Sequence, residues 1–296
     1  MSIYSDTTRA LFSQAHKKRN EGMKVPETIN AIKDIRYGEL GDDQNWQLLD
    51  LYLPGGYDTE GSNPVIVSVH GGGWVEGDKD EYSFYCMNIA SKGYAVINFS
   101  YRLAPEYPFP AALEDLGNVL KWIWDTREKY GFDTGSIFGI GDSAGGHILA
   151  LYTALLTEGE DGKEYPYVFS KIRFRALGLN CASIFLGEYS ALKTPSRHSL
   201  EDLVGGELTE SKFLKLKPEP HITENFPPTF LVSSSRDFLK EQPDLVKSLL
   251  DKKGVPCRYR IYGSDEKPLG HCFFLDLRLP ESEIAMQDEL DFFSII

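Results

Sequence analysis

The residues with the clearest chemical potential lie in the segment GDSAG, residues 141–145, where a serine stands among small residues. An apolar, strand-like run precedes this segment, and a helix-like run begins at Ser143. A sharp strand-to-helix turn exposes a serine hydroxyl above the edge of a sheet, and the glycines give its strained backbone room. The pattern predicts that Ser143 is a nucleophile, while a tight turn with a capping serine is the competing interpretation. Ala144 would then offer a backbone N–H without an intrahelical partner to a developing oxyanion.

A second segment, HGGGW at residues 70–74, ends a nearly continuous apolar run. Its three glycines let backbone N–H groups approach a ligand with no side chain in the way. We expect the N–H groups of Gly72 and Gly73 to complete an oxyanion hole with that of Ala144. A phosphate-binding loop is the alternative, but the spacing does not fit the G-x-x-x-x-G-K-S/T pattern. We interpret His70 as a structural residue, because it precedes the nucleophile in the chain.

Strand-like and helix-like segments alternate along the chain and must position these residues. The alternation predicts an α/β fold with a mostly parallel sheet and helices on both faces. Ligands bind beyond the carboxyl ends of the strands in such sheets, which is where Ser143 is expected. The expected strands are 32–39, 46–54, 64–70, 94–102, 136–140, 173–183, 228–235 and 257–263, and the expected helices are 82–93, 108–131, 143–157, 241–253 and 281–294.

Length, charge and cysteine content exclude several classes of protein. With 296 residues, 42% of them hydrophobic, the chain can bury one large core, so residues 1–296 are expected to form a single domain. A net charge of −13 argues against a nucleic-acid partner. No run is apolar enough for a signal peptide or a membrane span, so we expect a cytoplasmic protein without a membrane partner. The four cysteines are widely spaced, match no zinc pattern, and are interpreted as reduced thiols.

Two segments fall outside the regular alternation. Residues 1–30 are expected to form an N-terminal helical segment, either at the rim of the site or, as we favour, packed peripherally on the sheet. Residues 184–226 are irregular and are interpreted as a small insert over the active site. The insert shows no long apolar stripe, so a large lid is not expected.

Three ordered motifs carry a resemblance to a known family. The segment HGGGW (70–74), the segment SYRLAPEYPFPAALED (100–115) and the segment GDSAGG (141–146) resemble the hormone-sensitive-lipase-like branch of the α/β-hydrolases and the related bacterial acetyl and feruloyl esterases. The resemblance covers roughly residues 30–296. It implies an eight-stranded α/β-hydrolase fold and hydrolysis of short acyl esters, without a cofactor or a metal.

The resemblance also implies the two remaining catalytic residues. The family places its acid just after a strand in a D-x-L setting and its base in H-x-F, which match Asp237 and His271 here. The chain departs from the family at Phe238, where a proline often follows the acid. Asp237 and His271 also follow Ser143 in the order that this fold requires.

Other ionisable residues fit the catalytic roles less well. Glu241 and Asp244 are better explained as favourable charges at the start of a helix, and Asp265 is a lesser candidate for the acid. We expect His147 to pack or to anchor a neighbouring loop. His198 and His221 precede the acid, so they are candidates only for pocket lining.

A small-molecule acyl ester is the expected substrate. Trp74 is the bulkiest residue beside the oxyanion glycines, and we expect it to limit the acyl side to short chains such as acetyl. The sequence of the insert is too polar to predict an apolar trench, and aromatic residues on the alcohol side favour acetylated carbohydrate as the alcohol. An amidase or peptidase on the same fold stays open because the machinery is shared. A non-catalytic, ligand-binding homologue would instead be signalled by loss of the nucleophile or the base.

Overall fold

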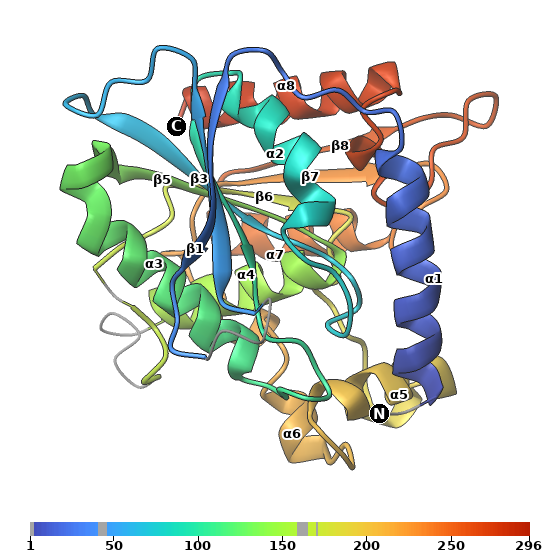
Figure 1. The fold of residues 1–296 in the computed structure, drawn as a ribbon. Helices are drawn as coiled ribbons and strands as arrows, with labels where there is room; N and C mark the ends of the chain where they lie inside the picture. Colours follow the sequence, from blue (N-terminus) through green and yellow to red (C-terminus); the bar gives the residue numbers. More distant parts are fainter. Residues whose placement is uncertain (1–2, 41–45, 159–164, 170) are drawn as a thin grey trace.

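The computed structural model describes residues 3–40, 46–158, 165–169 and 171–296. Within them, eight strands form one sheet in the order β1-β2-β4-β3-β5-β6-β7-β8, which confirms the predicted α/β-hydrolase fold (Figure 1). Only the pairs β1–β2 and β2–β4 are antiparallel among the described strand pairs. The strands are β1 (Ile29–Arg36), β2 (Leu48–Pro54), β3 (Asn63–Val69), β4 (Ala95–Ser100), β5 (Phe132–Asp142), β6 (Ala176–Asn180), β7 (Thr229–Ser234) and β8 (Cys257–Tyr262).

Helices cover both faces of the sheet and create two hydrophobic cores. The first core lies under α3 (Ala111–Tyr130), α4 (Ser143–Thr157) and α7 (Gln242–Lys252). The second lies under α2 (Ser83–Ala90) and α8 (Pro280–Ser294). Every residue of β4, β6 and β7 is buried, because central parallel strands have a core on each face. This burial explains why those segments read as continuous apolar runs rather than as alternating ones.

The sheet order brings together the loops that carry the predicted site. The parallel strands β3, β5, β6 and β7 are consecutive neighbours, so their carboxyl ends meet along one edge. The glycine loop follows β3, Ser143 follows β5, and the loop with Asp237 follows β7. Cys181 follows β6 and therefore lies between the strand of the nucleophile and the strand of the acid.

The insert is more ordered than its sequence suggests. It contains α5 (Thr194–Leu203), α6 (Glu210–Leu214) and single turns of 3-10 helix at Tyr189–Ala191 and Glu219–His221. The side chain of Thr209 caps α6 by accepting a hydrogen bond from the N–H of Lys212. These short elements connect β6 to β7 and extend beyond the carboxyl edge of the sheet.

The N-terminal segment does not pack on the sheet, which corrects the peripheral position that we favoured. Helix α1 (Ile3–Asn20) packs against α5 and against the turn Asp80–Tyr82, and it stands apart from the helices on the sheet faces (Figure 1). The segment also ends earlier than residue 30, since β1 begins at Ile29, and residues 1 and 2 lie outside the described residues. Only Ser5 of this helix is fully buried, and the sequence of the helix is polar on average, so it offers no broad apolar face to bury against a sheet. No helix among the described residues combines the length and the apolarity needed to cross a bilayer.

Candidate active site

Ser143 occupies a sharp turn between β5 and α4. Its φ is 50°, a left-handed conformation that a serine adopts only where surrounding contacts impose it. The contacts are close: a Cβ on Gly145 would lie 2.2 Å from the carbonyl oxygen of Val69, and one on Gly146 would lie 2.4 Å from the Cβ of Ala182. Glycine at position 145 therefore lets α4 press against the end of β3, and glycine at position 146 lets it press against the segment that follows β6. The half-buried Ser143 lines a large cavity at this edge of the sheet.

The glycine loop after β3 faces the same cavity. Gly72 and Gly73 have φ values of 119° and 61°, and a Cβ on Gly72 would lie 1.9 Å from the carbonyl oxygen of Glu76. Among the described residues, no protein acceptor meets the N–H groups of Gly72 and Gly73. Ala144 lies in the first turn of α4, and the Asp142 side chain does not cap this helix. The three N–H groups predicted to bind an oxyanion are thus left for a ligand in this cavity.

Asp237 and His271 meet directly although 34 residues separate them. Nδ1 of His271 donates a hydrogen bond to Oδ1 of Asp237 over 2.8 Å. The side chain of Asp237 is fully buried and also accepts from the N–H of Leu239 at 2.8 Å and the hydroxyl of Ser233 at 3.2 Å. These bonds hold the carboxylate in one orientation. The Nδ1 bond in turn leaves Nε2 of His271 as the ring nitrogen able to accept a proton.

The contact between Asp237 and His271 shifts the pKa values of both side chains. Burial disfavours the charged imidazole, but the hydrogen bond to Asp237, the neighbouring Cys181 and the charge of Asp237 outweigh it, so the pKa of His271 lies above its ordinary value. Burial likewise opposes the ionised carboxylate, yet the partner imidazole holds the pKa of Asp237 below its usual range. The pair is therefore built to stabilise an imidazolium.

The rival acids lie elsewhere. Asp265 is 91% exposed at its side chain and pairs with Arg236 at 3.2 Å. Asp244 accepts a hydrogen bond from the hydroxyl of Tyr259 at 2.9 Å on the surface, and Glu241 directly precedes α7. None of these three carboxylates lines the cavity that contains Ser143 and His271.

Two histidines have structural surroundings, as expected from the sequence. His70 is fully buried, stacks on Tyr101 with ring centroids 4.1 Å apart, and bonds through Nδ1 to the carbonyl of Gly71 at 2.8 Å. The Tyr101 hydroxyl donates to the carbonyl of His70 at 2.8 Å, which braces the glycine loop. His147 anchors the insert, because its Nε2 lies 2.7 Å from the carbonyl of Leu216.

The two candidate pocket histidines in the insert do not line the cavity. His198 is half exposed beside Glu201, at 3.1 Å, and His221 pairs with Glu158 at 2.6 Å. His198 therefore bonds within the insert, and His221 links the insert to the end of α4. His16 of α1 does line the cavity, a position that its sequence context does not indicate.

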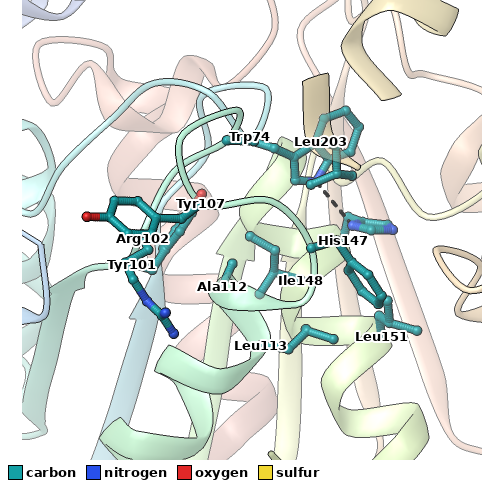
Figure 2. Close-up of a pocket in the computed structure, with 12 residues that line it drawn as sticks. Trp74, Tyr101, Arg102, Tyr107, Ala112, Leu113, His147, Ile148, Leu151 and Leu203 are labelled. Carbon is teal, nitrogen blue, oxygen red and sulfur yellow. Dashed lines mark hydrogen bonds between the residues drawn. The ribbon is translucent and has the colours of Figure 1, made fainter. Parts of the chain in front are cut away.

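Trp74 forms a partition between two cavities. Its indole N–H donates to Nδ1 of His147 at 3.1 Å, and the rings meet edge to face (Figure 2). Burial lowers the pKa of His147 to about 4, so the ring is neutral, and its Nε2–H donates to the carbonyl of Leu216. Behind the indole lies a cavity of about 20 Å³, bordered also by Tyr107 and Leu203, which has room for about one water.

The cavity in front of Trp74 is large, with a volume of about 1030 Å³. Helix α1 forms one wall beside the glycine loop. If Gly73 carried a Cβ, that atom would lie 3.9 Å from the side chain of Thr8 and 4.0 Å from that of Phe12. The insert forms another wall through Phe185, Leu186 and Leu200. The insert therefore contributes apolar side chains to the cavity wall, together with Ser196 and Ser199, which its polar sequence did not indicate.

Asp142 links three segments around the site. Its buried carboxylate accepts from the N–H of Gly71 at 3.0 Å, the hydroxyl of Tyr82 at 2.9 Å and the thiol of Cys272 at 3.3 Å. Burial raises the pKa of Asp142, and these donors offset part of that cost. Asp142 thus ties the glycine loop, the nucleophile turn and the loop of His271 together.

Two groups of described residues have the donor types and spacing to hold a metal ion. One comprises Cys181, His271 and Cys272, and the other comprises His16, Glu76 and Glu81. The spacing of the cysteines in sequence predicts no such group, because the fold alone brings Cys181 and Cys272 together. Sequence reasoning also missed Phe12, which reaches the cavity from α1, and the contact of Phe238 with His271, whose ring centroids are 4.3 Å apart.

Comparisons with known proteins agree with this architecture. Residues 49–242 match the BD-FAE family. The chain is 29% identical over 249 residues to the versiconal hemiacetal acetate esterase of Dothistroma septosporum, which covers 78% of this chain and 72% of that protein. It is 43% identical over 163 residues to the arylacetamide deacetylase of Bos taurus, covering 52% of this chain and 37% of that protein.

A solved structure extends the likeness to nearly the whole chain. The inhibited esterase B from Lactobacillus rhamnosis superimposes with a TM-score of 0.88 at 25% identity, covering 99% of this chain and 96% of that one. The fold, the family match and the esterase relatives lead to one assignment. This chain belongs to the BD-FAE family and is a carboxylic ester hydrolase of the hormone-sensitive-lipase-like α/β-hydrolases.

Proposed function

We propose that the enzyme is a serine carboxylesterase in which Ser143 attacks the ester, His271 acts as base and Asp237 orients the imidazole. The observation that carries this proposal is the 2.8 Å bond between His271 Nδ1 and Asp237 Oδ1, beside the cavity that Ser143 also lines. The strained turn at Ser143 further supports it, since it turns the residue toward that cavity.

The chemistry proceeds in two halves. Nε2 of His271 takes the proton of the Ser143 hydroxyl as the oxygen attacks the acyl carbon, and Asp237 stabilises the resulting imidazolium. The N–H groups of Gly72, Gly73 and Ala144 bind the oxyanion, and one such donor typically contributes about 10²–10³ in turnover. His271 then protonates the departing alcohol. A water, deprotonated by His271, attacks the acyl-enzyme and releases the acid.

We propose a short acyl group on the Trp74 side of the site. The indole is held by His147, and only about 20 Å³ lies behind it, so a long chain finds no space there. A binding site gains about 0.8 kcal/mol per buried methylene only where it has room for the group. The much larger space under α1 would then receive the alcohol. Acetylated carbohydrate is one candidate alcohol, and the apolar walls Phe12, Phe185 and Leu200 favour aryl or alkyl alcohols as its competitor.

Replacement of the nucleophile tests the mechanism. Ser143→Ala should fold like the wild type, with an unchanged melting temperature to within a few degrees, yet lose about 10⁶-fold in turnover, because the three residues act as a unit. A fluorescent alkyl phosphonate should label the wild type once and leave Ser143→Ala unlabelled. Ser183→Ala, a change at another serine of the cavity, is the matched control and should keep both labelling and activity. Turnover by Ser143→Ala within tenfold of the wild type would refute the mechanism.

An acyl-length series tests the substrate side. We expect kcat/KM for p-nitrophenyl esters, measured from acetate to dodecanoate, to be highest at acetate or butyrate. Trp74→Ala should shift the maximum to longer chains by joining the two cavities. Phe185→Ala, which shortens an aromatic side chain elsewhere in the large cavity, should leave the maximum where it is. A wild-type maximum at octanoate or beyond would contradict the short acyl site.

Amide hydrolysis is the second candidate activity. The supporting observation is the local identity of 43% to a relative whose name denotes deacetylation of arylacetamides. Aryl acetamides and the corresponding aryl acetates should be compared at equal concentration. A kcat/KM for the amide that equals or exceeds that for the ester would favour this candidate.

A further inference from the structure

Two cysteines converge beneath the imidazole of His271. Cys181 follows β6 and is 2% exposed, while Cys272 is the residue after His271. The N–H of Cys272 donates to Sγ of Cys181 over 3.4 Å. The two sulfur atoms and a ring nitrogen of His271 lie within 4.8 Å of one another. Two soft sulfur atoms and one imidazole nitrogen, from segments that are 91 residues apart, thus share one small volume.

The backbone is shaped to hold both thiols there. Cys181 and Cys272 have φ values of 50° and 53°, a left-handed conformation that is uncommon for cysteine. The N–H of Cys181 donates to the carbonyl of Val232 at 2.6 Å, which ties the turn after β6 to β7. Neither thiol has a part in the ester hydrolysis proposed above, so the reaction itself does not explain this arrangement.

The surroundings favour a positive ion. The Cys272 thiol donates to the carboxylate of Asp142 at 3.3 Å, and Asp237 lies on the other side against His271. Two carboxylates therefore flank a group of three ligand atoms. His271, Cys272 and Asp142 also line the large cavity, which opens a route for an ion from solvent to the thiols.

We propose that Cys181, Cys272 and His271 form a binding site for a thiophilic divalent cation such as Zn²⁺ or Cd²⁺, and that the bound ion reversibly inhibits the enzyme. The donor set of two thiolates and one imidazole suits tetrahedral Zn²⁺, with ligand bonds of about 2.3 Å to sulfur and about 2.0 Å to nitrogen. Water supplies the fourth ligand. Each thiol releases one proton when the ion binds, and no electron is transferred.

Inhibition follows because the proposed mechanism uses His271 as its base. This half of the inference therefore rests on the proposed function. An ion on Nε2 occupies the nitrogen that must accept the serine proton. An ion on Nδ1 instead displaces the hydrogen bond to Asp237 and with it the tautomer that the base requires. Either mode of binding removes the base, while Ser143 and the oxyanion groups stay in place.

Binding of the ion can be measured without an assay of enzymatic activity. The full chain, stripped with a chelator and kept reduced, is titrated with Cd²⁺ while the ultraviolet thiolate-to-metal absorption is recorded. We expect the thiolate absorption to saturate at one Cd²⁺ per chain, with the intensity of two thiolates, whatever binds at the group His16, Glu76 and Glu81. Cys181→Ser and Cys272→Ser should each weaken the affinity at least about 10–100-fold, since even loss of a supporting group around a metal costs that much. Cys257→Ser, at a cysteine outside the group, is the matched control and should bind like the wild type.

The same titration in Ser143→Ala separates this inference from the proposed function. The variant should bind Cd²⁺ with unchanged affinity whether or not Ser143 is the nucleophile. In the wild type, ester hydrolysis should fall in proportion to the bound Cd²⁺ and return when the chelator is added.

Three results would overturn the proposal. The first is the absence of a thiolate absorption in the reduced wild type at excess Cd²⁺. The second is full binding by the Cys181→Ser, Cys272→Ser double variant. The third is a loss of activity that a thiol reductant reverses and a chelator does not, because that would assign the pair to disulfide formation.

Discussion

At the residue scale, the site depends on which carboxylate meets His271. Asp237 is buried, bonded to Ser233 and Leu239, and 2.8 Å from Nδ1 of the imidazole, whereas Asp265 is exposed in the loop before it. The residue after the acid, Phe238, departs from the proline common in the family. Its ring packs against the imidazole of His271 while the adjacent carboxylate keeps its bonds, so the departure changes the wall of the cavity and not the orientation of the acid.

We predict that Asp237→Asn lowers kcat by about 10⁴, because an amide at this position favours the wrong imidazole tautomer. The melting temperature should change little, since asparagine has the same size and can still accept from the N–H of Leu239. Steady-state kinetics on p-nitrophenyl acetate measure the effect. Asp265→Asn is the matched control and should keep wild-type kcat. If Asp265→Asn is inactive and Asp237→Asn is not, the acid has been wrongly assigned.

At the scale of the element, α1 forms one wall of the cavity that contains the site. Arg9 donates to the carbonyl of Val75 at 2.6 Å and to Glu106 at 2.7 Å, which fastens the helix to the glycine loop and to its neighbour. Ser5 bonds to Asp202 of α5, and His16 bonds to Glu81. These bonds all join charged or polar groups. The docking of the helix is therefore sensitive to charge, and so is the shape of the cavity that it covers.

We predict that α1 loosens as the pH rises. Burial disfavours charged His16, but hydrogen bonds to Glu76 and Glu81 raise its pKa to about 9. A pKa raised in the folded state gives a stabilisation that is complete below the ordinary imidazole pKa of about 6.5 and is lost as the pH rises through about 9. Hydrogen exchange of peptides from α1, corrected for intrinsic rates, should show less protection at pH 10 than at pH 6.

A neutral replacement provides the control for this pH dependence. His16→Gln should abolish the change in protection, because glutamine carries no charge at either pH. Lys17→Gln, on the exposed side of the same helix, should retain it. Equal protection of wild-type α1 at both pH values would exclude the ion pairs of His16 as the cause of docking.

At the scale of the whole molecule, one buried acid opposes stability at neutral pH. Glu289 of α8 is 1% exposed beneath the sheet, and a Cβ on Gly178 would lie 1.8 Å from its Oε1. Burial raises its pKa to about 7, although the neighbouring Asn180 and Tyr85 lower it in part. Since the folded state holds the proton more tightly than the unfolded chain, stability falls as the pH rises from about 4.5 to about 7.

We predict that Glu289→Gln stabilises the protein at pH 8 and is nearly neutral at pH 4.5. The shift from 4.5 to about 7 corresponds to about 3 kcal/mol of unfolding free energy, an upper value because glutamine fits the site imperfectly. Urea unfolding at the two pH values measures the difference. Glu283→Gln, at a position 57% exposed on the same helix, should change stability by less than about 1 kcal/mol. A Glu289→Gln variant that is less stable than the wild type at pH 8 would contradict the buried-acid argument.

The sequence by itself determined the sheet, the helices that cover its faces and the class of enzyme. Apolar runs and helical periodicity are local patterns, and a parallel sheet has few ways to connect them. The glycines around Ser143 and at residues 70–74 are also visible as local motifs, although the structure shows that Gly145 and Gly146 are required by the close approach of Val69 and Ala182. The predicted residues Ser143, Asp237 and His271 could therefore be proposed from motifs and chain order, and the structure brings Asp237 and His271 into contact.

Only the tertiary structure decided what surrounds these residues. A polar helix such as α1 has no strong apolar face, so its position follows from distant partners such as Glu81 and Glu106 rather than from its own pattern. The inward direction of Phe185 and Leu200 likewise depends on what the insert folds against. Cys181 and Cys272 meet under His271 because β6 lies between β5 and β7, a neighbourhood that no spacing along the chain encodes.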